Sequence, residues 1–91
     1  MVKLVEVYES STGHILREVY VNPKHVVSLR EDARFMKKLR EGQLPPELRG
    51  EHVFTKVTID KGSTGLEIVV IGSPGIVEAK LRGDGRELLN G

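Results

Sequence analysis

Polar and apolar residues alternate along residues 53–60, which read VFTKVTID. A period of two with many β-branched residues predicts a half-buried strand. The apolar run at residues 66–71 is interrupted only by Glu67, and a run of this kind predicts a strand with both faces covered. Residues 61–65 between them contain two glycines and favour a turn, so we expect the two strands to form a hairpin.

A short helix is predicted directly after this hairpin. Ser73 fits the N-cap position, a proline follows at the first helical position, and Gly83 fits the residue that ends the helix. Val77 and Leu81 are four residues apart and therefore lie on one helix face, with Ile76 beside them. We expect this face to pack against the hairpin.

The N-terminal half has a similar order of elements. Residues 2–8 and 15–21 are largely apolar segments on either side of a Ser-Ser-Thr-Gly turn, and they predict an antiparallel hairpin. An Asn-Pro pair breaks the second strand, and residues 26–29 predict a short third strand. Asp32 can cap a helix that ends at Gly42.

These elements predict an α+β fold with two small antiparallel β units, about five strands in all, and two short helices. We expect the sheet to be covered on one side. A chain of 91 residues builds one core, so residues 1–83 are expected to form a single domain. Residues 84–91 contain two glycines and few apolar residues, and we expect them to form a flexible C-terminal tail.

The predicted helix after Asp32 carries the strongest charge contrast in the chain. Clustered cations on one helix face can follow a phosphate backbone, or can meet an acidic partner. Six cations in and before this helix are candidates for contact with nucleic acid or a protein partner: Lys24, Arg30, Arg34, Lys37, Lys38 and Arg40. Aromatic side chains that could stack on bases are not interleaved with them, so a solvated helix face is the alternative interpretation.

Composition argues against several kinds of site. The chain has no cysteine, which excludes disulfides and zinc–thiolate sites. None of the three histidines has a second ligand three or four residues away, and neither a G-x-S-x-G motif nor a complete phosphate-binding loop is present. We therefore expect no catalytic residue, no metal, no cofactor and no enzyme activity.

Net charge and hydropathy narrow the range of partners. The formal net charge of +1 does not by itself imply a polyanionic partner. No apolar run has the length of a membrane span, so we expect a soluble, cytoplasmic protein without a membrane partner. No small-molecule substrate is evident from the sequence.

Two blocks of the sequence are similar to a known family. The blocks are VYVNPKHVVSL and TKVTID…LEIVVIG…SPGIVEAKL. They resemble the flagellar-protein FlbD-like family and related small bacterial and phage proteins, and their strand order is more distantly similar to LytTR-type DNA-binding domains. The resemblance implies a small regulatory or accessory protein without a defined active site, so it assigns a role to no residue. The basic insertion at residues 30–52 departs from the family pattern.

The sequence favours a small non-catalytic adaptor or regulatory protein that acts by protein–protein contact. Short strands in a small sheet leave exposed edges, and such edges pair with a second copy or with a partner chain. The alternative is a nucleic-acid-binding module that uses the basic helix around residues 34–40.

Overall fold

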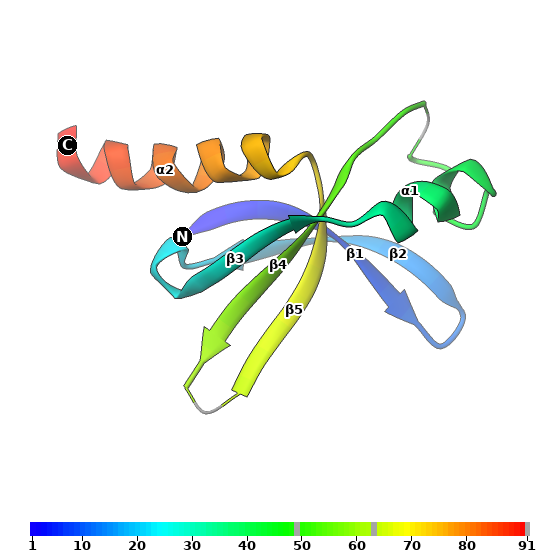
Figure 1. The fold of residues 1–91 in the computed structure, drawn as a ribbon, viewed down its shortest axis with the longest axis horizontal. Coiled ribbons are helices and arrows are strands. Elements are labelled where there is room, and N and C mark those ends of the chain that lie inside the picture. The colour runs from blue at the N-terminus through cyan, green and yellow to red at the C-terminus, as the bar shows by residue number, and fades with distance from the viewer. Residues whose placement is uncertain (49, 63, 91) are drawn as a thin grey trace.

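The computed structural model describes residues 1–48, 50–62 and 64–90, and Figure 1 shows their arrangement. Five antiparallel strands form one sheet in the order β2-β1-β5-β4-β3, accompanied by two helices and a 3-10 turn, which confirms the α+β fold. The elements are β1 (Val2–Ser10), β2 (Gly13–Val21), η1 (Pro23–His25), β3 (Val26–Glu31), α1 (Ala33–Arg40), β4 (Phe54–Lys61), β5 (Thr64–Ile71) and α2 (Pro74–Asn90).

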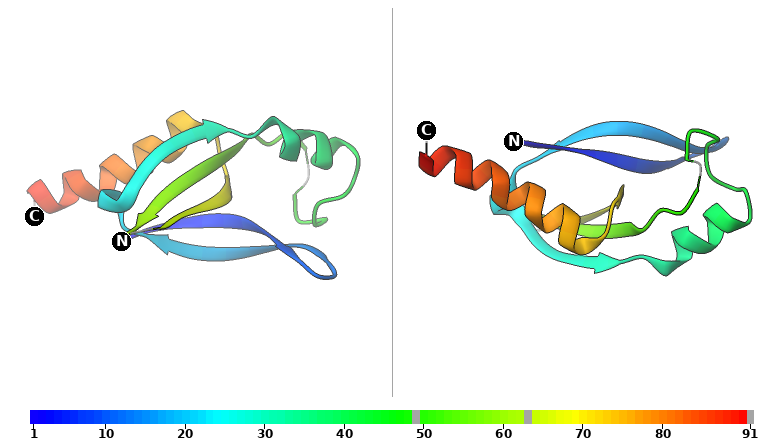
Figure 2. Two further views of the ribbon diagram at one scale, coloured as in Figure 1. Left: turned by 60° about the horizontal axis from the view of Figure 1, so that its bottom comes forward. Right: turned by 90° about the horizontal axis from the view of Figure 1, so that it is seen from above.

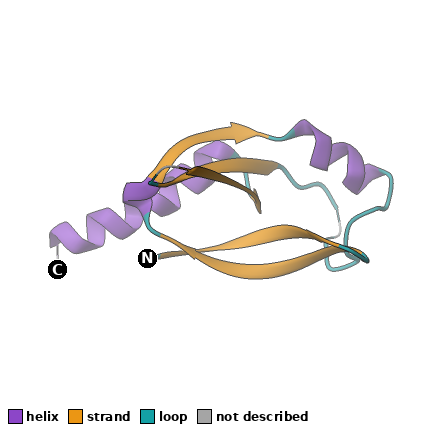
Figure 3. Cartoon of the chain, turned by 90° about the horizontal axis from the view of Figure 1, so that it is seen from below, coloured by secondary structure: helices purple, strands orange, loops and turns teal. Residues whose placement is uncertain are grey.

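The two expected β units are parts of one open sheet. Consecutive strands pair with each other, with the exception of β2 and β3, and β5 pairs with β1. The strands β2 and β3 are therefore the two edges, although only η1 separates them along the chain. Figures 2 and 3 show that the sheet coils, so that the β1–β2 hairpin lies opposite β3 and β4.

Turn chemistry sets the register of the first hairpin. Ser10 pairs with Gly13, so Ser11 and Thr12 form a two-residue turn. The Ser10 hydroxyl donates a hydrogen bond to the Gly13 carbonyl at 2.9 Å, and Gly13 has a φ of +139°, which favours glycine. In the second hairpin the strands extend into the predicted turn as far as Lys61 and Thr64, and Ser63 lies outside the described residues.

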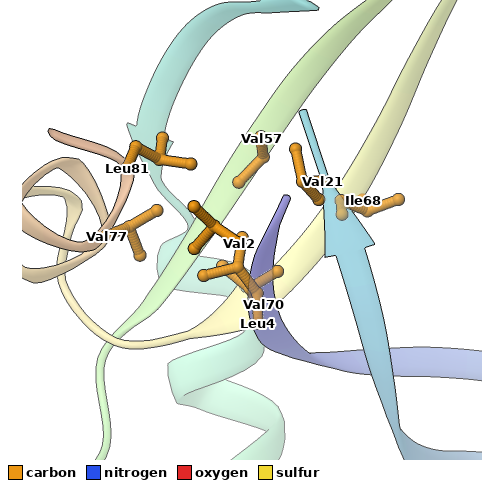
Figure 4. Packing of buried hydrophobic residues seen from close by; sticks show 8 residues of the cluster. All are labelled: Val2, Leu4, Val21, Val57, Ile68, Val70, Val77 and Leu81. Atoms are coloured by element: carbon orange, nitrogen blue, oxygen red, sulfur yellow. The ribbon is translucent and has the colours of Figure 1, made fainter. Parts of the chain in front are cut away.

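One apolar cluster lies on the sheet face that α2 covers, and Figure 4 shows how its side chains meet. Of the predicted helix stripe, Val77 and Leu81 point into this cluster, whereas Ile76 is 56% exposed. Its buried members come from β1, β2, β4, β5 and α2: Val2, Leu4, Val21, Val57, Ile68, Val70, Val77 and Leu81.

A second apolar cluster lies on the opposite face, under α1. The prediction that β4 is half-buried is wrong, because Phe54 is as fully buried as Val57. These two residues are three positions apart on one strand, so their side chains point to opposite faces. Phe54 packs with Val7 and with Phe35 of α1, and the loop after α1 adds two leucines, Leu44 and Leu48.

The start of α2 is as predicted, but its end is not. The Ser73 hydroxyl accepts a hydrogen bond from the Ile76 N–H at 3.3 Å, as expected of an N-cap. Gly83 does not end the helix, because it is absent from the glycines with positive φ among the described residues, and α2 continues to Asn90. Figure 1 shows the last turns of α2 extending beyond the sheet. The flexible tail stays a prediction, because the side chains of residues 84–91 lie outside those described.

Candidate interaction surface

The outer edge of β2 is the longest open edge of the sheet. Among the described residues, β2 pairs only with β1, and it does so along all nine of its residues without a register shift. The other edge strand, β3, has six residues, a register shift between Val26 and Ser28, and contacts with α2. Bulges and covering helices protect an edge from pairing, whereas a long regular edge accepts another strand. The available edge is therefore β2.

The two-residue turn also determines which backbone groups of β2 face outward. The residues that flank such a turn, Ser10 and Gly13, form a hydrogen-bonded pair, and bonded and non-bonded pairs then alternate along the hairpin. Every second residue of β2 from Gly13 onward thus bonds to β1. The residues between them direct their N–H and C=O groups to the free edge: His14, Leu16, Glu18 and Tyr20.

Large apolar side chains are exposed along this edge. Ile15 is 48% exposed and Tyr20 is 62% exposed. Tyr8, the cross-strand partner of Ile15 on β1, is also exposed. Exposed apolar side chains beside unpaired backbone groups are the combination that strand-pairing partners use, with the backbone giving affinity and the side chains giving specificity.

A charged pair lies on the α2-facing side of the same hairpin. Arg17 Nε donates to Glu6 Oε1 at 2.9 Å, and the guanidinium carbon lies 3.6 Å from the centroid of the Tyr8 ring. The Glu6 side chain is only 7% exposed, so Arg17 balances a buried carboxylate. The hydrogen bond to Glu6 raises the pKa of Arg17. Sequence reasoning missed this pair, although counting cross-strand partners back from the turn places Glu6 opposite Arg17.

The six cations predicted as a contact surface do not form one group. Lys24 lies in η1, before β3, whereas four of the others lie on α1, after it. The six residues of β3 span about 20 Å between these two elements. Arg30 lies near the α1 end of β3, directly opposite Lys56 of β4. The structure thus brings Arg30 near the helix and leaves Lys24 at the other end of the strand.

Arg34 is engaged by Asp32. The backbone N–H of Arg34 donates to Asp32 Oδ1 at 3.0 Å, and Arg34 Nη2 lies 3.3 Å from Asp32 Oδ2. The carboxylate therefore caps α1 as predicted and also neutralises the first cation of the helix. Burial alone would raise the pKa of Asp32, but the hydrogen bonds and the charge of Arg34 outweigh it and lower the pKa below its ordinary value.

Lys38 faces the first hairpin, whereas the sequence predicts it on the solvated side of the helix. Its Nζ atom lies 3.4 Å from His14 Nε2, 3.7 Å from Glu9 Oε2 and 4.7 Å from the centroid of the Phe35 ring. The side chain is 30% exposed. The expectation that Lys38 lies on the solvated side is therefore wrong, because its ammonium group lies over the Phe35 ring and also meets Glu9.

The remaining predicted cations lie at the surface of the helix. Lys37 and Arg40 are exposed on α1, and Arg40 borders a hollow of about 340 Å³ that Met36 and Leu39 also line. Nucleic-acid binding by charge needs several cations aligned along one phosphate backbone. Binding of nucleic acid by the exposed cations of α1 therefore stays a prediction.

Three further findings concern the kind of site that the chain can hold. Within the described residues, no group of three or more histidines and acids could hold a metal ion. None of the described helices has the length and apolar character needed to cross a lipid bilayer. Comparison of the chain with protein-family models, with curated proteins and with solved structures finds no match. The resemblance to the FlbD-like family therefore stays an expectation.

Proposed function

We propose that this protein is a non-catalytic adaptor or regulator that acts by protein–protein contact, with β2 as the strand that pairs with its partner. One observation carries the proposal: nine regular residues of β2 have a paired inner edge and an open outer edge. Proteins normally protect an edge of this length and regularity, and an unprotected one is a template for another strand.

The expected interaction is reversible. Four outward residues of β2 offer about eight backbone hydrogen bonds, each with a net contribution of about 1 kcal/mol. The loss of translational and rotational freedom on association costs at least about 4 kcal/mol and often much more. Backbone pairing, at about 8 kcal/mol, is thus of the same order as this cost. The exposed side chains of Ile15 and Tyr20 then determine which partner binds with useful affinity.

The decisive variant is Glu18→Pro. The N–H of Glu18 points to the free edge, so proline removes one outward donor and places its ring where a second strand would lie, a position that edge strands tolerate. Glu18→Thr is the matched control, because threonine keeps the N–H and suits a strand. Both variants lose the surface ion pair in which Lys3 Nζ lies 3.1 Å from Glu18 Oε2.

The assay immobilises the wild type and both variants and offers each of them host-cell extract and untagged wild-type protein. We expect Glu18→Thr to capture the same protein as the wild type and Glu18→Pro to lose it, while circular dichroism shows all three folded. Equal capture by all three would place the contact away from β2. Absence of capture by the wild type would contradict a function in protein–protein contact.

A further inference from the structure

Twofold symmetry restricts how β2 could pair with its own copy. Two identical edge strands related by a twofold axis perpendicular to the sheet run antiparallel and keep the same side chains on the same face. The axis must then pass through a residue of β2 that faces its own copy. Three positions near the middle of the strand allow long overlap: Leu16, Arg17 and Glu18.

Side-chain chemistry separates these three registers. An axis at Arg17 places two guanidinium groups directly opposite each other, and an axis at Glu18 places two carboxylates opposite each other. Like charges directly opposite in a sheet are destabilising. An axis at Leu16 avoids both, because it pairs Leu16 with Leu16 and His14 with Glu18 on either side.

The surroundings of His14 favour the same register. His14 Nε2 lies 3.4 Å from Lys38 Nζ, so a carboxylate that approaches His14 across the edge also approaches a cation. Glu9 already lies within 3.6 Å of His14 Nε2, and Lys38 offsets its charge. Glu18 of a second copy would thus come close to the imidazole of His14 and the ammonium group of Lys38. The register at Leu16 therefore pairs the carboxylate of Glu18 from one copy with a cation that α1 places beside β2 of the other copy.

We infer that the strand that pairs with β2 is β2 of a second copy, joined antiparallel about a twofold axis at Leu16. The inference rests on the proposed function, since it needs the outer edge of β2 to be the contact. Residues 13–19 of the two copies overlap, and three bonded pairs give about six backbone hydrogen bonds. The overlap ends before η1, so the corner where the chain passes to β3 stays clear.

Cysteine cross-linking can read this register, because the chain has no cysteine of its own. A bonded antiparallel pair separates its Cα atoms by about 5.5 Å, which lies within the range for a disulfide of about 4.4–6.8 Å. Leu16→Cys should therefore form a disulfide-linked dimer with a mild oxidant. Arg17→Cys would face its copy only diagonally, at about 7–8 Å, and Glu18→Cys would lie farther away.

We expect Leu16→Cys to yield roughly tenfold more covalent dimer than Arg17→Cys or Glu18→Cys, because only its Cα separation suits a disulfide. Val5→Cys, on a strand inside the sheet, gives the background from random collision. Adding Glu18→Pro to Leu16→Cys should reduce the dimer to this background. A mixture of separately purified His14→Cys and Glu18→Cys proteins should form the mixed dimer in preference to either homodimer, and this arm tests the register independently of Leu16.

Each result decides. Dominant cross-linking at residue 17 or 18 overturns the register at Leu16. If Leu16→Cys forms only background amounts of covalent dimer and the mixed dimer does not form, a second copy is not the strand that pairs with β2. In that case the proposed function still stands if Glu18→Pro loses a captured protein that Glu18→Thr retains. If that difference between the Glu18 variants also vanishes, the proposed function fails with it.

Discussion

Replacing Phe35 with alanine tests whether α1 is bound to the sheet as described. Phe35 is the buried residue of α1 and is 7% exposed. Its ring lies 5.9 Å from that of Phe54, 5.8 Å from that of His14 in an edge-on arrangement, and beneath the ammonium of Lys38. Phe35 thus contacts residues of α1, β2 and β4. Its removal leaves a cavity between α1 and the sheet face opposite α2.

The size of the effect follows from this burial. Truncation of a buried phenylalanine to alanine costs about 3–5 kcal/mol, whereas a Phe→Leu change that keeps most of the volume costs about 1.5 kcal/mol or less. A domain of this length has a total stability of roughly 5–14 kcal/mol. Phe35→Ala should therefore lower the melting temperature by at least about 12 °C, and Phe35→Leu by a few degrees.

Urea unfolding followed by circular dichroism measures the free energy of unfolding for both variants. Hydrogen exchange then shows whether the loss is global or confined to α1 and the loop after it. We expect the backbone amides around Val57 and Val77 to stay the most protected from exchange. These residues belong to the cluster that α2 covers, whereas Phe35 belongs to the cluster on the other face of the sheet. A loss below about 1 kcal/mol for Phe35→Ala would refute the reasoning, since so small a value indicates an unburied ring.

Two further predictions concern the helix ends. Asp32→Ala removes the N-cap of α1 and should cost about 1 kcal/mol in urea unfolding at neutral pH, whereas Asp32→Asn keeps a capping oxygen and should cost less. Because the folded state lowers the pKa of Asp32 from 3.8, its contribution is present above that pH and is lost as the pH falls. The stability difference between wild type and Asp32→Asn should thus shrink in acid, and a pH-independent difference would contradict the role of the charge. Deleting residues 84–91 should lower the melting temperature in calorimetry by only a few degrees, about 1 kcal/mol or less, because Val77 and Leu81, which are buried in the core cluster, precede the deleted segment. A collapse in stability would show that the tail docks on the core.

Local signals in the sequence were sufficient to identify the five strands and the starts of both helices. Strand periodicity identified all five strands, and the caps at Asp32 and Ser73 are formed as predicted. These signals act over a few residues and depend on backbone geometry alone. The end of α2 was missed for a different reason: a glycine inside a helix costs only about 1 kcal/mol, so Gly83 can be accommodated within a longer helix.

Tertiary contacts explain what the sequence did not reveal. Alternation along β4 shows that Phe54 and Val57 face opposite ways, but only the position of α1 determines that both faces are covered. The position of Lys38 was predicted wrongly for the same reason, because its partner Glu9 lies on the first hairpin. Spacing along one helix predicts which cations share a face, but it does not show which acids from other strands neutralise them.

The two edges of the sheet differ in protection, and this difference supports β2 as the contact. Closing the coiled sheet would require β2 and β3 to pair, since these are the consecutive strands that do not. The turn η1 begins with Pro23, which lacks an N–H donor, and β3 is irregular next to it, between Val26 and Ser28. Packing of α2 against β3 and η1 then covers that side. The features that keep β3 from pairing also leave the outer edge of β2 without a strand partner among the described residues, so its outward N–H and C=O groups are open to a strand from another molecule.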